Sequence, residues 1–129
     1  KARDLDLENQ EGIVTGWGLT QEGGIPANSM MQATVSIFND TACKGFYEST
    51  DIITKQMMCV GHPEGKMDSC VGDSGGPLVV NQNETYTLAG IVSWGRGCGR
   101  PNLPGVYTRM IGLTDWVKEK AADAVWCEP

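Results

Sequence analysis

Short apolar runs, several of them alternating with polar residues, fill the chain as far as residue 109 and are separated by glycine and proline. Runs of this length and period are typical of β-strands rather than helices. We therefore expect six strands, at residues 12–19, 30–37, 56–60, 77–80, 85–94 and 105–109. Regular short strands followed by one terminal helix favour an all-β Greek-key barrel.

Two segments have helical signals instead. Asn39 and Asp40 place a capping residue ahead of a short helix that runs toward Tyr47. Near the C-terminus the apolar spacing changes to that of an amphipathic helix over about residues 113–125. We expect this helix to dock through one apolar face, which consists of Leu113, Trp116, Val117, Ala121, Ala124 and Val125.

Composition limits the class of protein. The chain has 129 residues, of which 40% are hydrophobic and 20% charged, with 17 glycines. These values suit one globular domain over residues 1–129, with the charged segment 1–11 as a linker or crossover. A net charge of −6 disfavours nucleic acid and anionic membranes as partners. No apolar run approaches the roughly 18 residues of a membrane span, and we expect neither a cofactor nor a metal ion.

The candidate chemistry centres on Ser74, which lies in the run Gly72-Asp73-Ser74-Gly75-Gly76-Pro77. A serine hydroxyl becomes a good nucleophile only when a neighbouring base takes its proton. Acyl transfer also requires donors aimed at the developing oxyanion. The glycines allow a tight turn in which the N–H groups of Gly72 and Ser74 point at one position. This pattern supplies half of a catalytic site.

The run around Ser74 resembles the nucleophile loop of the trypsin/chymotrypsin serine proteases, which use a Ser-His-Asp triad. Five further motifs occur in the order of that family, at residues 16–18, 68–70, 93–95, 104–109 and 115–117. The resemblance implies the second half of a double Greek-key β-barrel with a C-terminal α-helix. In this family the triad histidine and aspartate precede the serine in the chain. We therefore expect a separate N-terminal protease chain to supply both, and this chain alone to be inactive.

The resemblance also implies how a substrate is recognised. Asp68 matches the carboxylate at the base of the primary specificity pocket, which predicts cleavage after arginine or lysine. Ser69 adds a hydroxyl beside this charge, while Gly95 and Gly105 keep the pocket walls open.

A second group of residues matches the substrate strand and the activation site. The backbone of Ser93, Trp94 and Gly95 is expected to pair with an extended substrate. Asp73 is expected to bind a released N-terminal amine. Because Lys1 does not resemble the start of an activated enzyme, the partner chain would supply that amine.

Five cysteines leave one without a partner. The resemblance implies disulfides Cys43–Cys59 and Cys70–Cys98. Cys127 has no partner in this pairing. We favour a disulfide from Cys127 to the N-terminal chain over a free thiol or a homodimer link. These features predict a secreted, two-chain enzyme made from a zymogen, with protein protease inhibitors as further partners.

Three alternatives stay open. The only histidine, His62, is either a relocated base for Ser74 or, as we favour, an ordinary loop residue. Of the two glycosylation sequons, Asn83 suits a glycan in a hairpin loop, whereas Asn39 suits a helix cap. A non-catalytic protease homologue that only binds its partner is the rival function. Against it stands the joint presence of five site residues, Ser74, Gly72, Asp68, Gly95 and Gly105.

Overall fold

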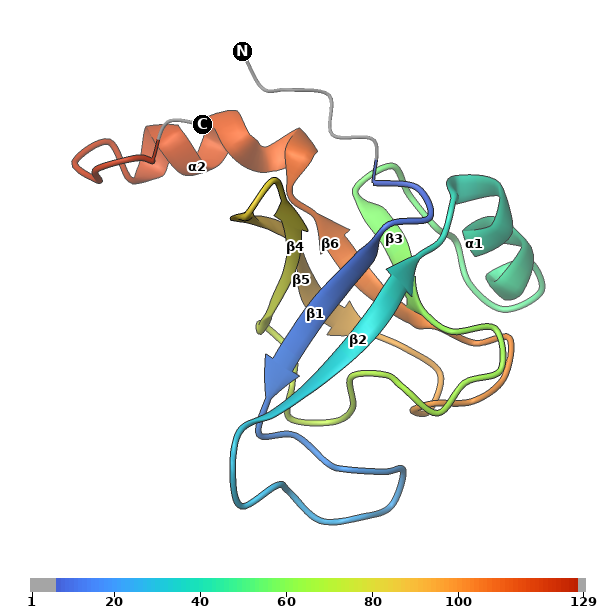
Figure 1. Cartoon of the computed structure of the whole chain (residues 1–129). Coiled ribbons are helices and arrows are strands. Elements are labelled where there is room, and N and C mark those ends of the chain that lie inside the picture. The colour runs from blue at the N-terminus through green and yellow to red at the C-terminus, as the bar shows by residue number, and fades with distance from the viewer. Residues whose placement is uncertain (1–6, 128–129) are drawn as a thin grey trace.

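The computed structural model describes residues 7–127. Within this range six antiparallel strands close a barrel in the order β1-β2-β3-β6-β5-β4 (Figure 1). The neighbours β4, β1, β2 and β3 have the order of a Greek key. The predicted all-β barrel with a C-terminal helix is confirmed. The strands are β1 (Glu11–Gly16), β2 (Met31–Ile37), β3 (Met57–Gly61), β4 (Pro77–Gln82), β5 (Thr85–Trp94) and β6 (Gly105–Arg109).

The strands expected at 30–37 and 56–60 differ from the structure by one residue at one or both ends, and two others differ by more, for identifiable reasons. The strand expected at 12–19 ends at Gly16, where the chain turns over the carboxylate of Asp73. The strand expected at 77–80 continues to Gln82, because a two-residue turn at Asn83 and Glu84 keeps β4 paired with β5. Both turn residues have positive φ, 50° and 64°, as a tight hairpin turn of this kind requires.

The barrel interior follows from the alternation seen in the sequence. In β2 the side chains of Val35 and Ile37 point inward, and in β4 those of Leu78 and Val80 do the same. All four are essentially inaccessible to solvent. Leu7, which precedes β1, is also buried in this core, so the described part of the predicted segment 1–11 packs on the barrel.

A second cluster lies beside the barrel under α1 (Asp40–Tyr47). The predicted cap is confirmed, since the side chain of Asn39 accepts a hydrogen bond of 2.8 Å from the N–H of Ala42. The disulfide Cys43–Cys59 joins this helix to β3. Tyr47 packs edge-on against Trp94 with ring centroids 5.2 Å apart, which connects the cluster to the end of β5.

The C-terminal helix expected over about 113–125 is present but shorter than predicted. A 3-10 turn, η1 (Ile111–Leu113), leads into α2 (Thr114–Lys120), and the helix ends because Ala121 leaves the helical conformation at φ −116° and ψ 49°. None of its residues is buried, and Trp116 is 59% exposed. Among the described elements its contacts are mainly with η1, so residues 7–127 do not bury the expected apolar face. No helix among residues 7–127 is long and apolar enough to cross a membrane.

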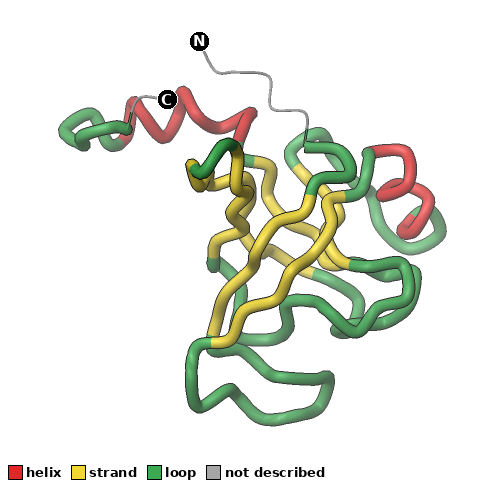
Figure 2. The backbone as a smooth tube through the Cα atoms, viewed as in Figure 1, coloured by secondary structure: helices red, strands yellow, loops and turns green. Residues whose placement is uncertain are grey.

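Antiparallel order brings three loops to one end of the barrel. Odd-numbered strands run toward this end and even-numbered strands run away from it. The connections between β1 and β2, β3 and β4, and β5 and β6 therefore lie together (Figure 1), and they contain much of the loop structure drawn green in Figure 2. Helix α2 lies toward the opposite end. Every motif residue between β1 and β2 or between β3 and β4 falls in this group of loops.

Candidate active site

Ser74 lies at the surface in the loop between β3 and β4. Its Oγ donates a hydrogen bond of 3.4 Å to the carbonyl of Ser93. The loop is held on β5 because Gly75 donates to the carbonyl of Val92 and Val92 donates to the carbonyl of Gly76, both at 2.9 Å. The candidate nucleophile is thus exposed on a loop whose backbone is fixed to a barrel strand.

The two expected oxyanion donors flank Asp73. The N–H groups of Gly72 and Ser74 donate to no other residue in the range 7–127. Gly72 has φ +98°, and a Cβ there would lie 3.1 Å from the Cα of Gly18. Glycine is therefore required at this position, and both N–H groups remain available to a bound carbonyl oxygen.

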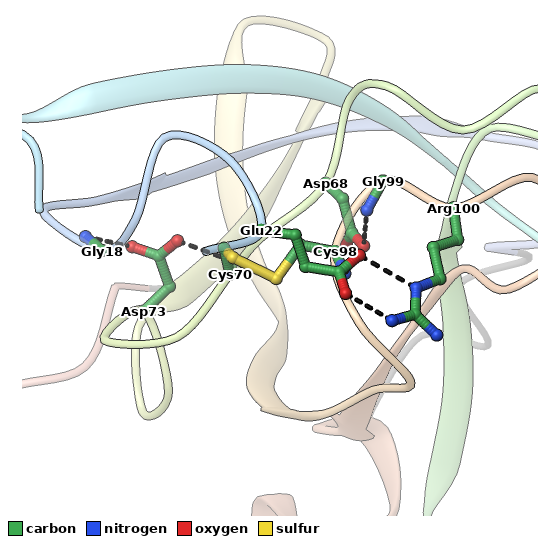
Figure 3. Close-up of a disulfide and its surroundings, with 8 residues drawn as sticks. All are labelled: Gly18, Glu22, Asp68, Cys70, Asp73, Cys98, Gly99 and Arg100. Atoms are coloured by element: carbon green, nitrogen blue, oxygen red, sulfur yellow. Dashed lines mark hydrogen bonds and ion pairs between the residues drawn. A yellow bond between two sulfur atoms is a disulfide. The ribbon is translucent and has the colours of Figure 1, made fainter. Parts of the chain in front are cut away.

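The carboxylate of Asp73 lies beneath the nucleophile loop. It accepts hydrogen bonds from the N–H groups of Gly18 at 2.8 Å and Cys70 at 2.9 Å (Figure 3). A Cβ at Gly16 would lie 2.0 Å from an Asp73 oxygen, and one at Gly18 would lie 2.6 Å away. A cavity of about 180 Å³ adjoins the carboxylate. The two glycines of the first motif therefore make room for Asp73, whose pairing with an amine stays a prediction.

We expect Gly16→Ala to destabilise the protein by about 1–3 kcal/mol, because the added methyl overlaps the carboxylate of Asp73. The comparison variant is Gly45→Ala, since a Cβ at this position in α1 meets nothing within 4 Å, and an alanine inside a helix should raise stability by up to about 1 kcal/mol. Urea denaturation of both variants measures the difference. Equal stabilities would show that the loop accommodates the methyl without displacing Asp73.

A cavity of about 220 Å³ opens beside Ser74. Asp68 and Ser69 line it from one loop, and Gly95 and Gly105 line it from the opposite wall. A Cβ at Gly105 would lie 2.9 Å from an oxygen of Asp68, and one at Gly95 would lie 3.6 Å from the Cα of Gly105. The fold therefore brings these four predicted pocket residues together with the candidate nucleophile.

Asp68 is the main charged group inside this cavity. One carboxylate oxygen accepts a hydrogen bond of 2.9 Å from the N–H of Gly99. The other is buried and has no hydrogen-bond partner among the described residues. Burial is the largest cause that raises the pKa of Asp68 to about 6. A buried carboxylate in this state is suited to a ligand that brings its own cation and donors.

Tyr107 is a pocket neighbour that the sequence reasoning did not single out. Its hydroxyl is also buried without a hydrogen-bond partner in the described range, and burial raises its pKa. Its ring approaches Gly105, where a Cβ would lie 3.0 Å from the ring carbon Cε1. Its place in the motif 104–109 was visible in the sequence, but alternation on β6 did not indicate that the ring lies beside Asp68.

The end of β5 offers a free strand edge beside the cavity. Strand β4 pairs with β5 no further than Ile91, and the pairing of β5 with β6 shifts register between Val92 and Trp94. Ser93 is the extra residue of this bulge, and both Ser93 and Gly95 are exposed. Bulges commonly redirect backbone next to active sites. The edge is suited to pairing with an extended peptide.

Comparison with known proteins agrees with this geometry. The family model for trypsin matches residues 1–117. The chain belongs to the trypsin family of chymotrypsin-type serine proteases. It is 50% identical to Trypsin-1 of Astacus astacus over 109 residues and 50% identical to a vitellin-degrading protease of Bombyx mori over 107 residues. These alignments cover 84% and 83% of this chain.

A third relative, Transmembrane protease serine 5 of Homo sapiens, is 41% identical over 113 residues, or 87% of this chain. The alignments cover 46%, 39% and 25% of the three relatives, respectively. The chain therefore spans less than half the length of the proteases that it matches.

The cysteines of this trypsin-family chain pair as predicted where the structure shows a bond. Cys70–Cys98 ties the nucleophile loop to the opposite pocket wall (Figure 3), and Cys43–Cys59 is formed as described above. Cys127 is exposed and unpaired within residues 7–127. Its disulfide to another chain stays a prediction.

His62 lies away from the nucleophile. Its Nε2 is 2.9 Å from the carbonyl of Thr34 on β2, whereas Ser74 bonds to β5. Strands β2 and β5 are not neighbours in the barrel. This placement favours the loop interpretation of His62 over a relocated base.

Proposed function

We propose that this chain carries the nucleophile and the specificity pocket of a serine endopeptidase that cleaves after arginine or lysine. One observation carries the proposal. Asp68 holds a buried carboxylate oxygen without a hydrogen-bond partner in the described range, in a cavity that Ser74 also lines. A guanidinium group binds a carboxylate through two parallel hydrogen bonds, and an ammonium group binds it as a point charge. The glycine walls leave space for a long side chain to reach it.

In the proposed mechanism Ser74 Oγ attacks the scissile carbonyl carbon while a base takes its proton. The N–H groups of Gly72 and Ser74 stabilise the resulting oxyanion. The C–N bond then breaks, the amine leaves with the proton from the base, and an acyl-enzyme forms at Ser74. Water, activated by the same base, hydrolyses the ester and releases the acid product. Backbone pairing at Ser93–Gly95 holds the substrate strand during both steps.

The base in this proposal comes from an N-terminal protease chain that also supplies the aspartate of the triad. Two observations support it. His62 is the only histidine and lies on the β2 side of the barrel. The apolar face of α2 is unburied, with Trp116 exposed, which suits packing against a further protein surface. Cys127 is the proposed site of a disulfide to this chain, and Asp73 the proposed partner of a released amine.

Two disulfides suit an oxidising, extracellular setting, and we propose secretion on this ground. Asn83 is exposed at the tip of the β4–β5 hairpin and is the preferred glycosylation site. Asn39, by contrast, uses its side chain as the α1 cap. Protein inhibitors that present an arginine or lysine would bind the same pocket.

Exposure of the native protein to a fluorophosphonate probe tests this function. Intact mass before and after reduction is the measurement. We expect one adduct on Ser74, because only an activated serine reacts, together with a second chain that reduction releases. A second chain without an adduct would instead support the non-catalytic binding homologue. No second chain and no adduct would contradict catalysis by this assembly.

A further inference from the structure

The pocket wall at residues 95–100 is built from a glycine-rich run between two arginines, Arg96 and Arg100. Gly97 and Gly99 both have left-handed φ, 70° and 66°. Glycine at such positions gives the isolated segment large conformational freedom. The disulfide at Cys98 fixes the wall at one point. The carbonyl of Gly99 accepts a hydrogen bond of 2.8 Å from the N–H of Lys66, which is a second fixed point. Contacts on the N–H side of the wall complete its orientation.

Glu22 provides such contacts from the loop between β1 and β2. Its carboxylate forms a two-point ion pair with Arg100, in which Nε donates at 2.9 Å and the second nitrogen donates to the other oxygen (Figure 3). The same carboxylate accepts a hydrogen bond of 3.2 Å from the N–H of Cys98. Arg100 and the N–H of Cys98 are therefore both bound to one side chain, and Gly99 lies between them.

The surrounding backbone accommodates this ion pair closely. A Cβ at Gly97 would lie 2.3 Å from Nε of Arg100 and 2.6 Å from a carboxylate oxygen of Glu22. The ion pair consequently lies against the wall and does not project into solvent at this point. The side chain of Arg100 is nevertheless 53% exposed and that of Glu22 is 41% exposed, so their contribution to global stability is small.

The ion pair connects the wall to the specificity carboxylate. Gly99 donates the only hydrogen bond from the wall to Asp68 within the described residues, at 2.9 Å. On the other side, the loop that carries Glu22 is bound to the nucleophile loop, since Leu19 donates to the carbonyl of Val71 at 2.8 Å. Glu22 thus joins three loops of the site: its own, the nucleophile loop and the pocket wall.

We propose that Glu22 and Arg100 are positioning residues for substrate specificity: they hold the N–H of Gly99 against Asp68 and thereby set the affinity of the pocket for arginine or lysine. This inference rests on the proposed function. Neither side chain touches the reacting atoms. Other groups also face Asp68: the neighbouring Ser69, the charge of Asp73 and the hydroxyl of Tyr107.

Kinetics of Glu22→Gln and Arg100→Gln in the assembled protease test the proposal with an arginyl peptide substrate. We expect KM to rise by roughly three- to five-fold with kcat within about two-fold, the pattern of lost ground-state binding. The acid limb of kcat/KM should move to higher pH, because Asp68 loses a hydrogen bond that favours its ionised form. Arg100→Lys, which keeps the charge without the planar fork, should fall between wild type and Arg100→Gln.

The matched control is Asp40→Asn, which removes an exposed ion pair with Arg109 on α1, away from the pocket. Its KM and acid limb should equal those of wild type. If Glu22→Gln and Arg100→Gln match this control in both quantities, the positioning role is wrong.

Hydrogen exchange separates this inference from the proposed function. The amides of residues 97–100 should exchange roughly three- to five-fold faster in Glu22→Gln than in Asp40→Asn, whether or not the protein cleaves arginyl substrates. Faster exchange in a protein without arginyl activity would overturn the proposed protease function but support the role of Glu22 in holding the wall. Unchanged exchange would overturn the positioning role of Glu22 even in an active protease.

Discussion

Replacing Ser74 with alanine is expected to lower kcat of the assembled protease by about a million-fold, the cost of removing the nucleophile from a serine protease triad. Ser74 is the exposed serine whose neighbouring N–H groups are available to an oxyanion. Without its Oγ no acyl-enzyme forms, and only the remaining binding and oxyanion groups assist attack by water. Hydrolysis of an arginyl ester, followed at saturating substrate, measures the effect.

Ser29→Ala is the control, because this exposed serine lies in the loop before β2, outside the cavity that Ser74 lines. The kcat of Ser29→Ala should equal that of wild type. Fluorophosphonate should label Ser74 in Ser29→Ala and should leave Ser74→Ala unlabelled. Residual turnover of Ser74→Ala within a hundred-fold of wild type would show that another group is the nucleophile.

The second large effect is expected at Asp68. In Asp68→Ser, kcat/KM for arginyl substrates should fall by about two to three orders of magnitude, since truncating one partner of a buried charge pair costs roughly 2–5 kcal/mol. Labelling of Ser74 by a fluorophosphonate should persist, because the nucleophile loop remains anchored on β5. Parallel assays on arginyl and alanyl substrates make the measurement. An unchanged preference for arginyl over alanyl substrates would show that Asp68 does not determine specificity.

The pKa of Asp68 adds a pH dependence to the same prediction. The pKa is raised by burial to about 6, so the carboxyl is neutral below that pH and loses its attraction for a cation. Binding of a small arylamidine, measured by calorimetry, should weaken about ten-fold per pH unit below 6 in wild type and stay flat in Asp68→Ser. Because binding of an amidine requires no catalytic base, its pH dependence reports the ionisation of Asp68 and not that of a catalytic histidine.

The raised pKa of Asp68 affects folding stability in the opposite direction from cation binding: ionisation strengthens binding but destabilises the fold. Because the folded-state pKa lies above the unfolded value of 3.8, Asp68 contributes stability below pH 3.8 that is lost as the pH rises through about 6. Asp68→Ser should therefore exceed wild type in free energy of unfolding at pH 8, by up to about 3 kcal/mol. Urea denaturation should show this difference shrinking toward zero as the pH falls to 4. A constant difference would mean that the serine changes packing and not ionisation.

The strands were predictable where local pattern and tertiary structure agree. The strands at 85–94 and 105–109 have the predicted bounds, because their apolar residues face a closed core and turn residues delimit them. The helix at 113–125 was not predictable in length. Its apolar periodicity continues past Ala121, but residues 7–127 do not bury that face, so the pattern alone could not locate the end.

The candidate site divides in the same way. Ser74, Gly72 and Asp68 were found because each belongs to a short contiguous motif with a chemical reason for its residue types. Glu22 and Arg100 were not found, since they are 78 residues apart and neither has a local signal of its own. Arg96, the other arginine of the pocket wall, forms an ion pair with Asp51 across a separation of 45 residues, and this pair has no local signal either.

By itself the sequence determined the barrel, the nucleophile loop, both disulfide pairs through the family resemblance, and the identity of the pocket carboxylate. Period-two alternation and glycine-containing turns are local properties, and these suffice to specify strands and catalytic motifs. Only the tertiary structure decided that Gly16 and Gly18 make room for Asp73, that Tyr107 lies beside Asp68, and that Glu22 holds the pocket wall. Those relations depend on chain segments that closure of the barrel brings together, and their separation in sequence leaves no periodic trace.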